Sequence, residues 1–246
     1  MIPNFEIENE YYRKALYDHK TGKVAREYLK KRCINEETIE KWKLGWSPYE
    51  CVPSIYNDWV GDYKPWSKLW GRITIPIYDQ NGKVVSISGR LVLKIDKPKY
   101  DHYSFPSRKV LFGLFQNKEE IQKNDRAIIT EGQMDVISSW QKGLRIVTSS
   151  FGAHCSLDHL AILSRYATRI DVLYDNDFAG NKGLNDIKKF TTHGDLIINL
   201  KQGIFPYGDD LDSWINKNSI DRLFNLLDSS KTDNLKNKLK KIKMKL

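Results

Sequence analysis

The sequence predicts an α/β protein whose N-terminal part is helical and then β-rich, and whose second part is a parallel sheet with helices. Residues 8–45 carry apolar side chains at helical spacing, whereas residues 71–115 change to an alternation of apolar and polar side chains. Residues 126–200 alternate short apolar runs with helical patterns. Strand–helix–strand repetition is typical of parallel pairing, because parallel strands need a long crossover connection.

In the first helical stretch, Ala25 and Leu29 recur on one face, and Asn35 offers an N-cap for a later helix. Gly45 and Pro48 end the pattern. The β-rich stretch then alternates isoleucines with Arg72, Thr74 and Pro76. This part of the chain therefore predicts helices followed by strands.

The β-rich stretch contains a hairpin signal. Asn81-Gly82 favours a tight turn between the strand at 72–77 and a second strand at 84–87. Pro76 predicts an edge or a bulge in the first strand, because proline cannot donate to a strand ladder.

The second part predicts three alternations of strand and helix. Strands are expected at 127–130, 146–148, 170–174 and 196–198, and helices near 136–140, at 157–167 and at 184–190. We expect an N-terminal subdomain at 1–122, a metal-binding domain at 123–217 and a lysine-rich helical tail at 218–246. Seven of the last sixteen residues are lysines, a pattern typical of a solvated end or of a segment that contacts nucleic acid.

Composition excludes several classes of protein. The 246 residues are 40% hydrophobic and carry a formal charge of +9, which fits a globular protein and favours a polyanionic partner. No apolar run approaches the ~20 residues that span a bilayer, and the acidic N-terminus is unlike a signal peptide. Three scattered cysteines fit neither a disulfide framework nor a zinc ribbon, so we expect a reducing, cytoplasmic setting and no zinc.

Carboxylates follow several of the predicted strands. Glu131 follows the first strand of the second part, Asp175 and Asp177 follow a later one, and Asp210 and Asp212 follow the strand near 196. Ligands of open α/β sheets bind beyond the carboxyl ends of the strands, so these acids should share a crevice. Oxygen ligands suit Mg²⁺ or Mn²⁺. Taken singly, an Asp-x-Asp pair is most often a turn or a helix cap.

Two of these segments resemble the motifs of Toprim domains. Residues 131–136 (EGQMDV) are similar to the "EGxxD" motif, and residues 175–180 (DNDFAG) are similar to "DxDxAG". Further segments resemble DnaG-type primases in the family order, from about residue 25 to 215. They are AREYLKKR at 25–32, GRITIPI at 71–77, SGR at 88–90, KY at 99–100, LFGL at 111–114, FGA at 151–153 and GDDLD at 208–212.

The resemblance implies an enzyme, a DNA-dependent RNA polymerase that makes short RNA primers on single-stranded DNA from ribonucleoside triphosphates. It implies Glu131, Asp175 and Asp177 as catalytic residues, and these three with Asp210, Asp212 and, more weakly, Asp135 as ligands of Mg²⁺ or Mn²⁺. It implies that a basic surface binds nucleic acid and nucleotide. The residues expected on that surface are Arg72, Arg90, Lys97, Lys99, Arg108 and Lys109, although solvated charge explains any one of them alone.

The sequence also departs from the family. Primases of this type begin with a zinc ribbon and end with a helicase-binding domain, neither of which is found in this sequence, and Leu211 replaces a proline between two acids. We therefore expect a replicative helicase, and possibly a separate zinc-binding protein, as partners. A core-only primase would suit a phage, working in the host cytoplasm.

Two other functions stay open. A Toprim nuclease would use the same acids but would not need the N-terminal segments. A non-catalytic nucleic-acid-binding replisome factor descended from a primase would not need the acids.

Overall fold

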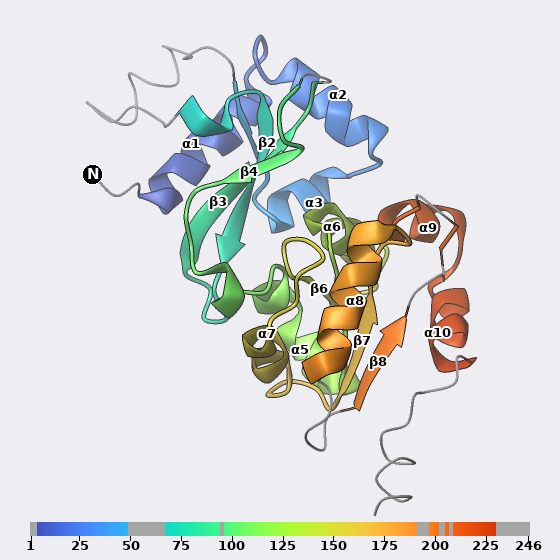
Figure 1. Ribbon diagram of the computed structural model, residues 1–246. Helices are drawn as coiled ribbons and strands as arrows, with labels where there is room; N and C mark the ends of the chain where they lie inside the picture. Colours follow the sequence, from blue (N-terminus) through green and yellow to red (C-terminus); the bar gives the residue numbers. More distant parts are fainter. Residues whose placement is uncertain are drawn as a thin grey trace, which may run out of the picture. The chain divides into compact units, whose positions relative to one another are not determined.

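A computed structural model describes residues 4–48, 67–93, 96–190, 197–201, 205–206 and 209–229. The chain divides into two compact units, Met1–Phe105 and Pro106–Leu246 (Figure 1). The subdomain limits expected from the sequence, at 122 and 217, stay predictions. The lysine-rich tail from residue 230 onward lies outside the described residues.

The first unit combines three helices with an antiparallel sheet in the order β1-β2-β3-β4. Helix α1 packs against β1, β2 and β3. The elements of this unit are α1 Phe5–Tyr17, α2 Lys23–Lys31, α3 Glu36–Lys41, β1 Gly45–Ser47, the short 3-10 helix η1 Ser67–Leu69, β2 Arg72–Tyr78, β3 Val84–Leu91 and β4 Tyr100–His102.

The helical stretch expected at 8–45 is broken into three helices by local turns. The Asp18 carboxylate accepts hydrogen bonds from the backbone N–H groups of Lys20 and Thr21, which ends α1 in a tight turn. Cys33, with φ 57°, reverses the chain after α2. The expected cap is confirmed, because the Asn35 side chain accepts from the Thr38 N–H at 2.9 Å.

The expected hairpin is present. Gly82 has φ 92°, and the Asp79 carboxylate accepts from the backbone N–H groups of Asn81 and Lys83. The β2–β3 register shifts between Ile77 and Tyr78, next to Pro76. The irregularity thus lies just beyond Pro76, which itself pairs in register with Ile87.

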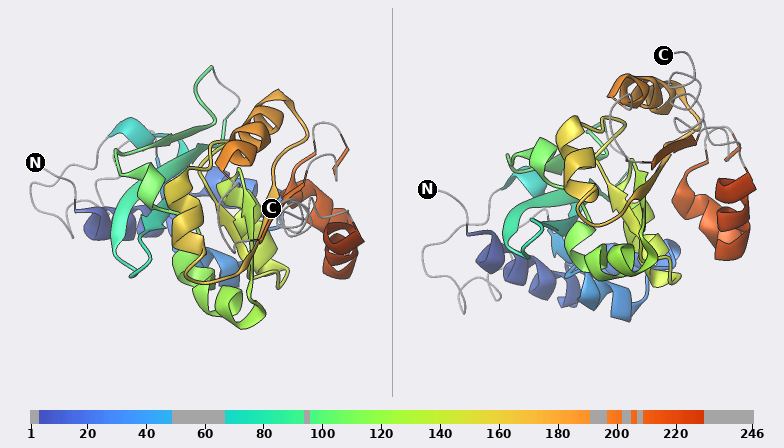
Figure 2. Two further views of the ribbon diagram at one scale, coloured as in Figure 1. Left: turned by 60° about the horizontal axis from the view of Figure 1, so that its bottom comes forward. Right: turned by 90° about the horizontal axis from the view of Figure 1, so that it is seen from below.

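The second unit holds a parallel sheet in the order β6-β5-β7-β8. Helices α5 and α8 lie on opposite faces of this sheet (Figure 2). The elements are η2 Ser107–Lys109, α5 Leu114–Asn124, β5 Arg126–Thr130, α6 Gln133–Gln141, β6 Val147–Ser149, α7 Leu157–Leu163, β7 Arg169–Leu173, α8 Phe178–Phe190, β8 Ile197–Lys201, α9 Leu211–Lys217 and α10 Ile220–Ser229. The α/β prediction is confirmed, although the sequence did not predict α5.

A partly buried ion-pair network ties α10 to this sheet. Asp171, in the middle of β7, is fully buried and lies 2.6 Å from Arg126 of β5. Arg126 and Arg169 also contact Asp228 of α10 at 3.2 and 2.7 Å. The Arg126 guanidinium lies 4.8 Å from the ring centroid of Phe224. Because Arg126 and Arg169 are the first residues of β5 and β7, these contacts fix α10 at the end of the sheet where the two strands begin.

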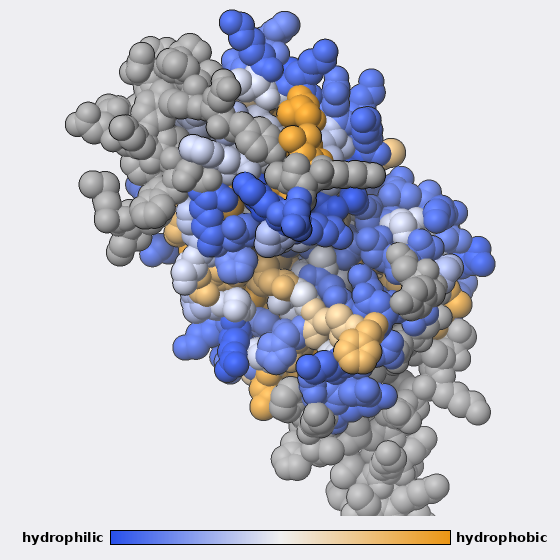
Figure 3. Space-filling model, turned by 45° about the horizontal axis from the view of Figure 1, so that its top comes forward, coloured by the Kyte–Doolittle hydropathy of each residue, from blue (hydrophilic) through white to orange (hydrophobic). Residues whose placement is uncertain are grey.

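The surface is largely polar. Most described residues on the face in Figure 3 are hydrophilic, and apolar residues form small separate groups. Within the part of the chain that the structure describes, no helix has the length and apolar character needed to cross a bilayer.

A buried carboxylate holds α1 against the sheet of the first unit. Glu8 is fully buried, and its Oε1 accepts hydrogen bonds from the hydroxyls of Tyr12 at 2.6 Å and Tyr103 at 2.5 Å. The rings of Tyr12 and Tyr103 belong to one apolar cluster with Leu69 and Ile87. The position of α1 therefore depends on this polar contact within an apolar core.

We expect Glu8→Ala to lower the free energy of unfolding by about 3 kcal/mol, because two buried hydroxyls lose their shared acceptor. Glu8→Gln keeps an acceptor oxygen and should lose less. The control is Glu6→Ala, an exposed position on the same helix. Denaturant unfolding followed by circular dichroism measures all three, and equal stability of Glu8→Ala and Glu6→Ala would contradict the assignment.

Candidate metal centre

The acids of the second unit meet because β5 and β7 are neighbours in the parallel sheet. Ile129 is in register with Val172, so the two strands end at the same edge. Glu131 follows β5 directly, and Asp175 follows β7 by two residues. The backbone N–H of Asp175 donates to Glu131 Oε1 at 3.2 Å. The structure therefore brings together these two predicted residues.

The Glu131 carboxyl is half-buried beside other acids. Burial, followed by the negative charges of Asp175 and Asp177, raises the pKa of Glu131 to about 7. The hydrogen bond from the Asp175 N–H acts in the opposite direction. At neutral pH this side chain can therefore either carry or release a proton.

Asp177 caps the helix that follows it. Its Oδ1 accepts from the Gly180 N–H at 2.8 Å at the start of α8. The glycine is required by space, because a Cβ atom at Gly180 would lie 2.1 Å from the Asp175 carbonyl oxygen and 2.9 Å from Glu131 Oε1. The cap and the close approach together hold α8 against the carboxylates.

Asp135 links this group to α9. Its side chain is 5% exposed at the first turn of α6 and accepts from the backbone N–H groups of Gly132 at 3.0 Å and Asp212 at 3.3 Å. Burial, followed by the charges of Asp210 and Asp175, raises the pKa of Asp135 well above its ordinary value. Asp135 therefore lies close to both acidic segments.

The last two acids lie at the start of α9, which packs against α6. Asp210 caps α9 by accepting from the Ser213 N–H at 2.9 Å. Asp212 is 5% exposed and accepts from Asn216 Nδ2 at 3.1 Å. Gly208, which belongs to the same motif, lies outside the described residues.

The six acids of this edge, which we call the carboxylate edge, fit a divalent cation by donor type. The carboxylate edge consists of Glu131, Asp135, Asp175, Asp177, Asp210 and Asp212. All of its side-chain donors are oxygens, and the mutual repulsion of the acids would be relieved by a cation. Within the described residues, no three His, Cys, Asp or Glu side chains are already arranged around one metal position. Side chains that now cap helices would have to rotate to become ligands.

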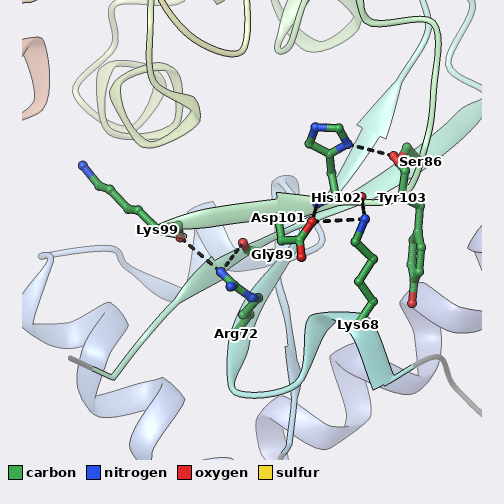
Figure 4. A network of polar contacts seen from close by, with 8 residues as sticks. All are labelled: Lys68, Arg72, Ser86, Gly89, Lys99, Asp101, His102 and Tyr103. Atoms are coloured by element: carbon green, nitrogen blue, oxygen red, sulfur yellow. Dashed lines mark hydrogen bonds and ion pairs between the residues drawn. The ribbon is translucent and has the colours of Figure 1, made fainter. Parts of the chain in front are cut away.

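The two predicted arginines of the first unit make structural contacts. Arg72 is 2% exposed, and its Nη1 donates to the carbonyl oxygens of Gly89 and Lys99, both at 3.3 Å (Figure 4). Arg90 is 6% exposed and donates to the hydroxyls of Tyr28 and Tyr100. Both guanidiniums connect strands or helices, and a phosphate-binding role for them stays a prediction.

The four remaining predicted cations are exposed. Lys97 and Lys99 lie in the first unit, and Figure 4 shows the Lys99 side chain extending away from the Arg72 network. Arg108 and Lys109 lie on η2 in the second unit. These side chains are available to a polyanion.

The sequence reasoning missed the residues that hold the Glu131 backbone. Ser149 Oγ donates to the Glu131 carbonyl oxygen at 2.7 Å, and the Gly152 N–H donates to the same oxygen at 2.9 Å. Ser150 Oγ lies 2.9 Å from the buried hydroxyl of Tyr174. The only signals were the two serines after the predicted strand at 146–148 and the FGA segment at 151–153.

Comparison with known proteins agrees with this geometry. Residues 128–215 match the family model described as Toprim-like. A DNA primase of Aquifex aeolicus (strain VF5) is 28% identical over 241 residues, which cover 90% of this chain and 47% of that protein. The chain therefore spans less than half the length of this curated relative.

Solved structures show the same fold. A crystal structure of the zinc-binding and RNA polymerase domains of the Aquifex aeolicus primase is 26% identical, with a TM-score of 0.77, and covers 92% of this chain and 60% of that one. A DnaG primase catalytic domain bound to single-stranded DNA is 21% identical, with a TM-score of 0.73, and covers 91% of this chain and 80% of that one. The chain thus carries a Toprim-like domain, and its similarity to DnaG-type primases extends over 90% of its residues.

We expect the metal-free protein to lose stability as the pH rises toward 7. The pKa of Glu131 is about 7 in the folded protein, against roughly 4.3 in the unfolded chain, so the unfolded state ionises first. The stability that the protonated Glu131 contributes to the folded state is fully present below about pH 4 and is lost as the pH rises through 7.

The Glu131→Gln variant lacks this contribution, whereas the raised pKa of Asp135 keeps part of the pH dependence. Unfolding by denaturant in the presence of a chelator, at about pH 5 and about pH 7.5, measures how the free energy of unfolding changes with pH. An unchanged slope in the variant would show that Glu131 titrates in its ordinary range.

Proposed function

We propose that this chain is the catalytic core of a DNA primase, a nucleotidyltransferase that makes short RNA primers on single-stranded DNA for replication. The observation that carries the proposal is the carboxylate edge of a Toprim-like domain, in which Glu131 accepts a hydrogen bond from the backbone of Asp175, and Asp135 accepts one from that of Asp212. The similarity to primases also includes the first unit, since it covers 90% of the chain.

The carboxylate edge would hold the divalent ions. Asp175, Asp177, Asp210 and Asp212 are the proposed ligands of Mg²⁺ or Mn²⁺, and Asp135 is a weaker one. When bound, such ions neutralise the triphosphate and align the attacking 3′-oxygen with the leaving pyrophosphate. No zinc is proposed.

Glu131 is proposed as the general base or as a further ligand. Its pKa of about 7 lets the side chain accept a proton near neutral pH, when the attacking 3′-hydroxyl must lose one. The hydrogen bonds from Ser149 and Gly152 to the Glu131 carbonyl hold the backbone that carries this carboxyl. Glu131 thus combines a pKa near neutral pH with a backbone held by hydrogen bonds.

The partners follow from this chemistry. Single-stranded DNA and ribonucleoside triphosphates are polyanions, and Lys97, Lys99, Arg108 and Lys109 offer exposed cations to them. A replicative helicase and a separate zinc-binding protein are proposed to position the template, because phosphate contacts carry little sequence information. We propose that the protein acts in the cytoplasm, in that of a host if it is phage-encoded.

Two alternatives use parts of the same structure. A Toprim-type nuclease would need the carboxylate edge but would not explain why the similarity to primases includes the first unit. A non-catalytic replisome factor would bind nucleic acid without the acids. The raised pKa values of Glu131 and Asp135, each repelled by other acids of the carboxylate edge, favour a catalytic protein, because such groups disfavour their own ionisation unless a cation binds.

We expect Asp175→Asn and Asp177→Asn to lower primer synthesis on the order of 100-fold or more, because each removes a charge that stabilises the metal-bound transition state. The assay is synthesis on single-stranded DNA with labelled ribonucleotides and Mg²⁺ or Mn²⁺, with and without the helicase from the same source. The matched control is Asp158→Asn, an exposed aspartate at the start of α7.

Wild-type synthesis by folded Asp175→Asn would refute the metal assignment. DNA cleavage without synthesis would identify a nuclease, and DNA binding without either reaction would identify a non-catalytic factor.

We expect single-stranded DNA to bind less tightly as salt increases. Each lysine–phosphate contact contributes about 0.7 to the slope of log affinity against log salt concentration, so the double variant Lys97→Ala/Lys99→Ala should reduce the slope by up to roughly 1.4. The control is Lys83→Ala, an exposed lysine at the hairpin on the opposite end of β3. Fluorescence anisotropy measures binding, and equal slopes for the double variant and Lys83→Ala would exclude these two contacts.

A further inference from the structure

The second unit begins with an exposed pair of cations. We call residues Ser107–Lys109, which form η2, the basic turn. Arg108 and Lys109 are both exposed, and within the described parts of the chain neither forms an ion pair with a carboxylate. As far as the structure describes the chain, these two adjacent cations are therefore available to an anion.

A buried histidine clamps the backbone of this turn. His159 of α7 is 2% exposed, and its Nε2 lies 2.7 Å from the Ser107 carbonyl oxygen. Its Nδ1 accepts from the Ser156 N–H at 3.2 Å, so the ring proton belongs on Nε2, which donates to Ser107. Ser156 Oγ adds a hydrogen bond to the Arg108 carbonyl oxygen at 3.3 Å. Successive carbonyls of the basic turn are therefore both held by α7.

The imidazole is neutral in this setting. Burial is the main cause that holds the pKa of His159 below its ordinary value, although the hydrogen bond to Ser107 opposes it. His154 and Asp158 are the charged or titratable groups that act on it. His159 therefore contributes two directed hydrogen bonds and adds no charge to the turn.

The basic turn is also tied to the carboxylate edge. Phe112 exchanges two backbone hydrogen bonds with Ser149, at 2.9 and 3.0 Å, and Ser149 Oγ donates to the Glu131 carbonyl oxygen at 2.7 Å. Arg108 precedes Phe112 by four residues, which span at most about 14 Å. The basic turn is therefore within four residues, along the chain, of the strand-end contact that holds Glu131.

Rigid backbone under mobile side chains lowers the cost of binding. Arginine and lysine have long stems that lose conformational freedom when they hold a phosphate, and a turn that was also mobile would lose more. A clamped turn fixes the backbone from which both cations extend before the anion arrives. The hydrogen bond from His159 Nε2 to the Ser107 carbonyl holds the turn, and the one that Nδ1 accepts from Ser156 orients the imidazole.

We propose that His159 is a positioning residue that fixes the basic turn so that Arg108 and Lys109 bind phosphate beside the carboxylate edge. This inference rests on the proposed function, which supplies phosphate from two sources, the backbone of a nucleic acid and a ribonucleoside triphosphate. The histidine acts through the turn and touches neither substrate.

The test measures phosphate binding separately from synthesis. Fluorescence anisotropy with a labelled single-stranded oligonucleotide, and competition by a ribonucleoside triphosphate, are compared for the full chain and its variants. His159→Asn keeps an acceptor near Nδ1 but cannot reach Ser107, and should weaken binding about three- to tenfold. His159→Gln places an amide N–H near Nε2 and should restore most of it.

A double-mutant cycle separates positioning from general stability. In the background Arg108→Ala/Lys109→Ala, His159→Asn should have no further effect on binding, because the cations it positions are gone. Thermal unfolding of each variant tests whether it is folded. If His159→Asn does not fold, Ser156→Ala, which releases the Arg108 carbonyl while keeping the imidazole, should weaken binding in the same direction.

Each outcome has a defined meaning. Loss of oligonucleotide binding alone assigns the turn to the nucleic-acid backbone, and loss of triphosphate competition alone assigns it to the nucleotide. Unchanged binding in both arms, or an equal effect of His159→Asn with and without the two cations, overturns the inference. Failure of the proposed function would instead appear as absent primer synthesis by the wild-type chain.

Discussion

Repulsion among carboxylates at one end of a parallel sheet is the constraint on which the second unit depends. Glu131 and Asp175 follow neighbouring strands, and Asp135 lies between the segments of Asp175 and Asp210. Backbone N–H groups offset part of the repulsion, since those of Asp175, Gly132 and Asp212 each donate to one of these acids. The remaining repulsion raises the pKa values of Glu131 and Asp135. A divalent cation binds favourably where acids repel one another in this way.

Cations in this chain divide into two groups by their surroundings. Arg72 and Arg90 are buried and donate to carbonyl and phenol oxygens, so their charge is used within the fold. Lys99 and Arg108 are exposed, and their charge faces solvent. A guanidinium offers several donors in a fixed plane and can join three elements, whereas a lysine holds a single point charge on a flexible stem. Burial rather than residue type therefore separates the cations used within the fold from those exposed to solvent, since Arg108 is also a guanidinium.

Some of the site could be predicted, and the physical reason is the periodicity of its strands. Apolar runs at 127–130 and 170–174 indicated strands, and an acid after each strand indicated a shared edge. Helix α5 was not predicted, because its apolar face is short and Gly113, with φ 82°, turns the chain into it directly after a β-rich segment. The hydrogen bonds of Ser149 and the space requirement of Gly180 depend on segments far apart in the sequence, so local patterns did not predict them.

By itself the sequence determined the α/β class, the order of the strands along the chain, the hairpin at Asn81-Gly82 and the acids that follow the strands. Tertiary structure alone decided that β5 lies between β6 and β7, so that Glu131 meets Asp175. It also decided that Arg72 is buried and that His159 holds the basic turn. Local patterns report what each segment prefers, whereas burial and hydrogen-bond partners arise only when distant segments pack together.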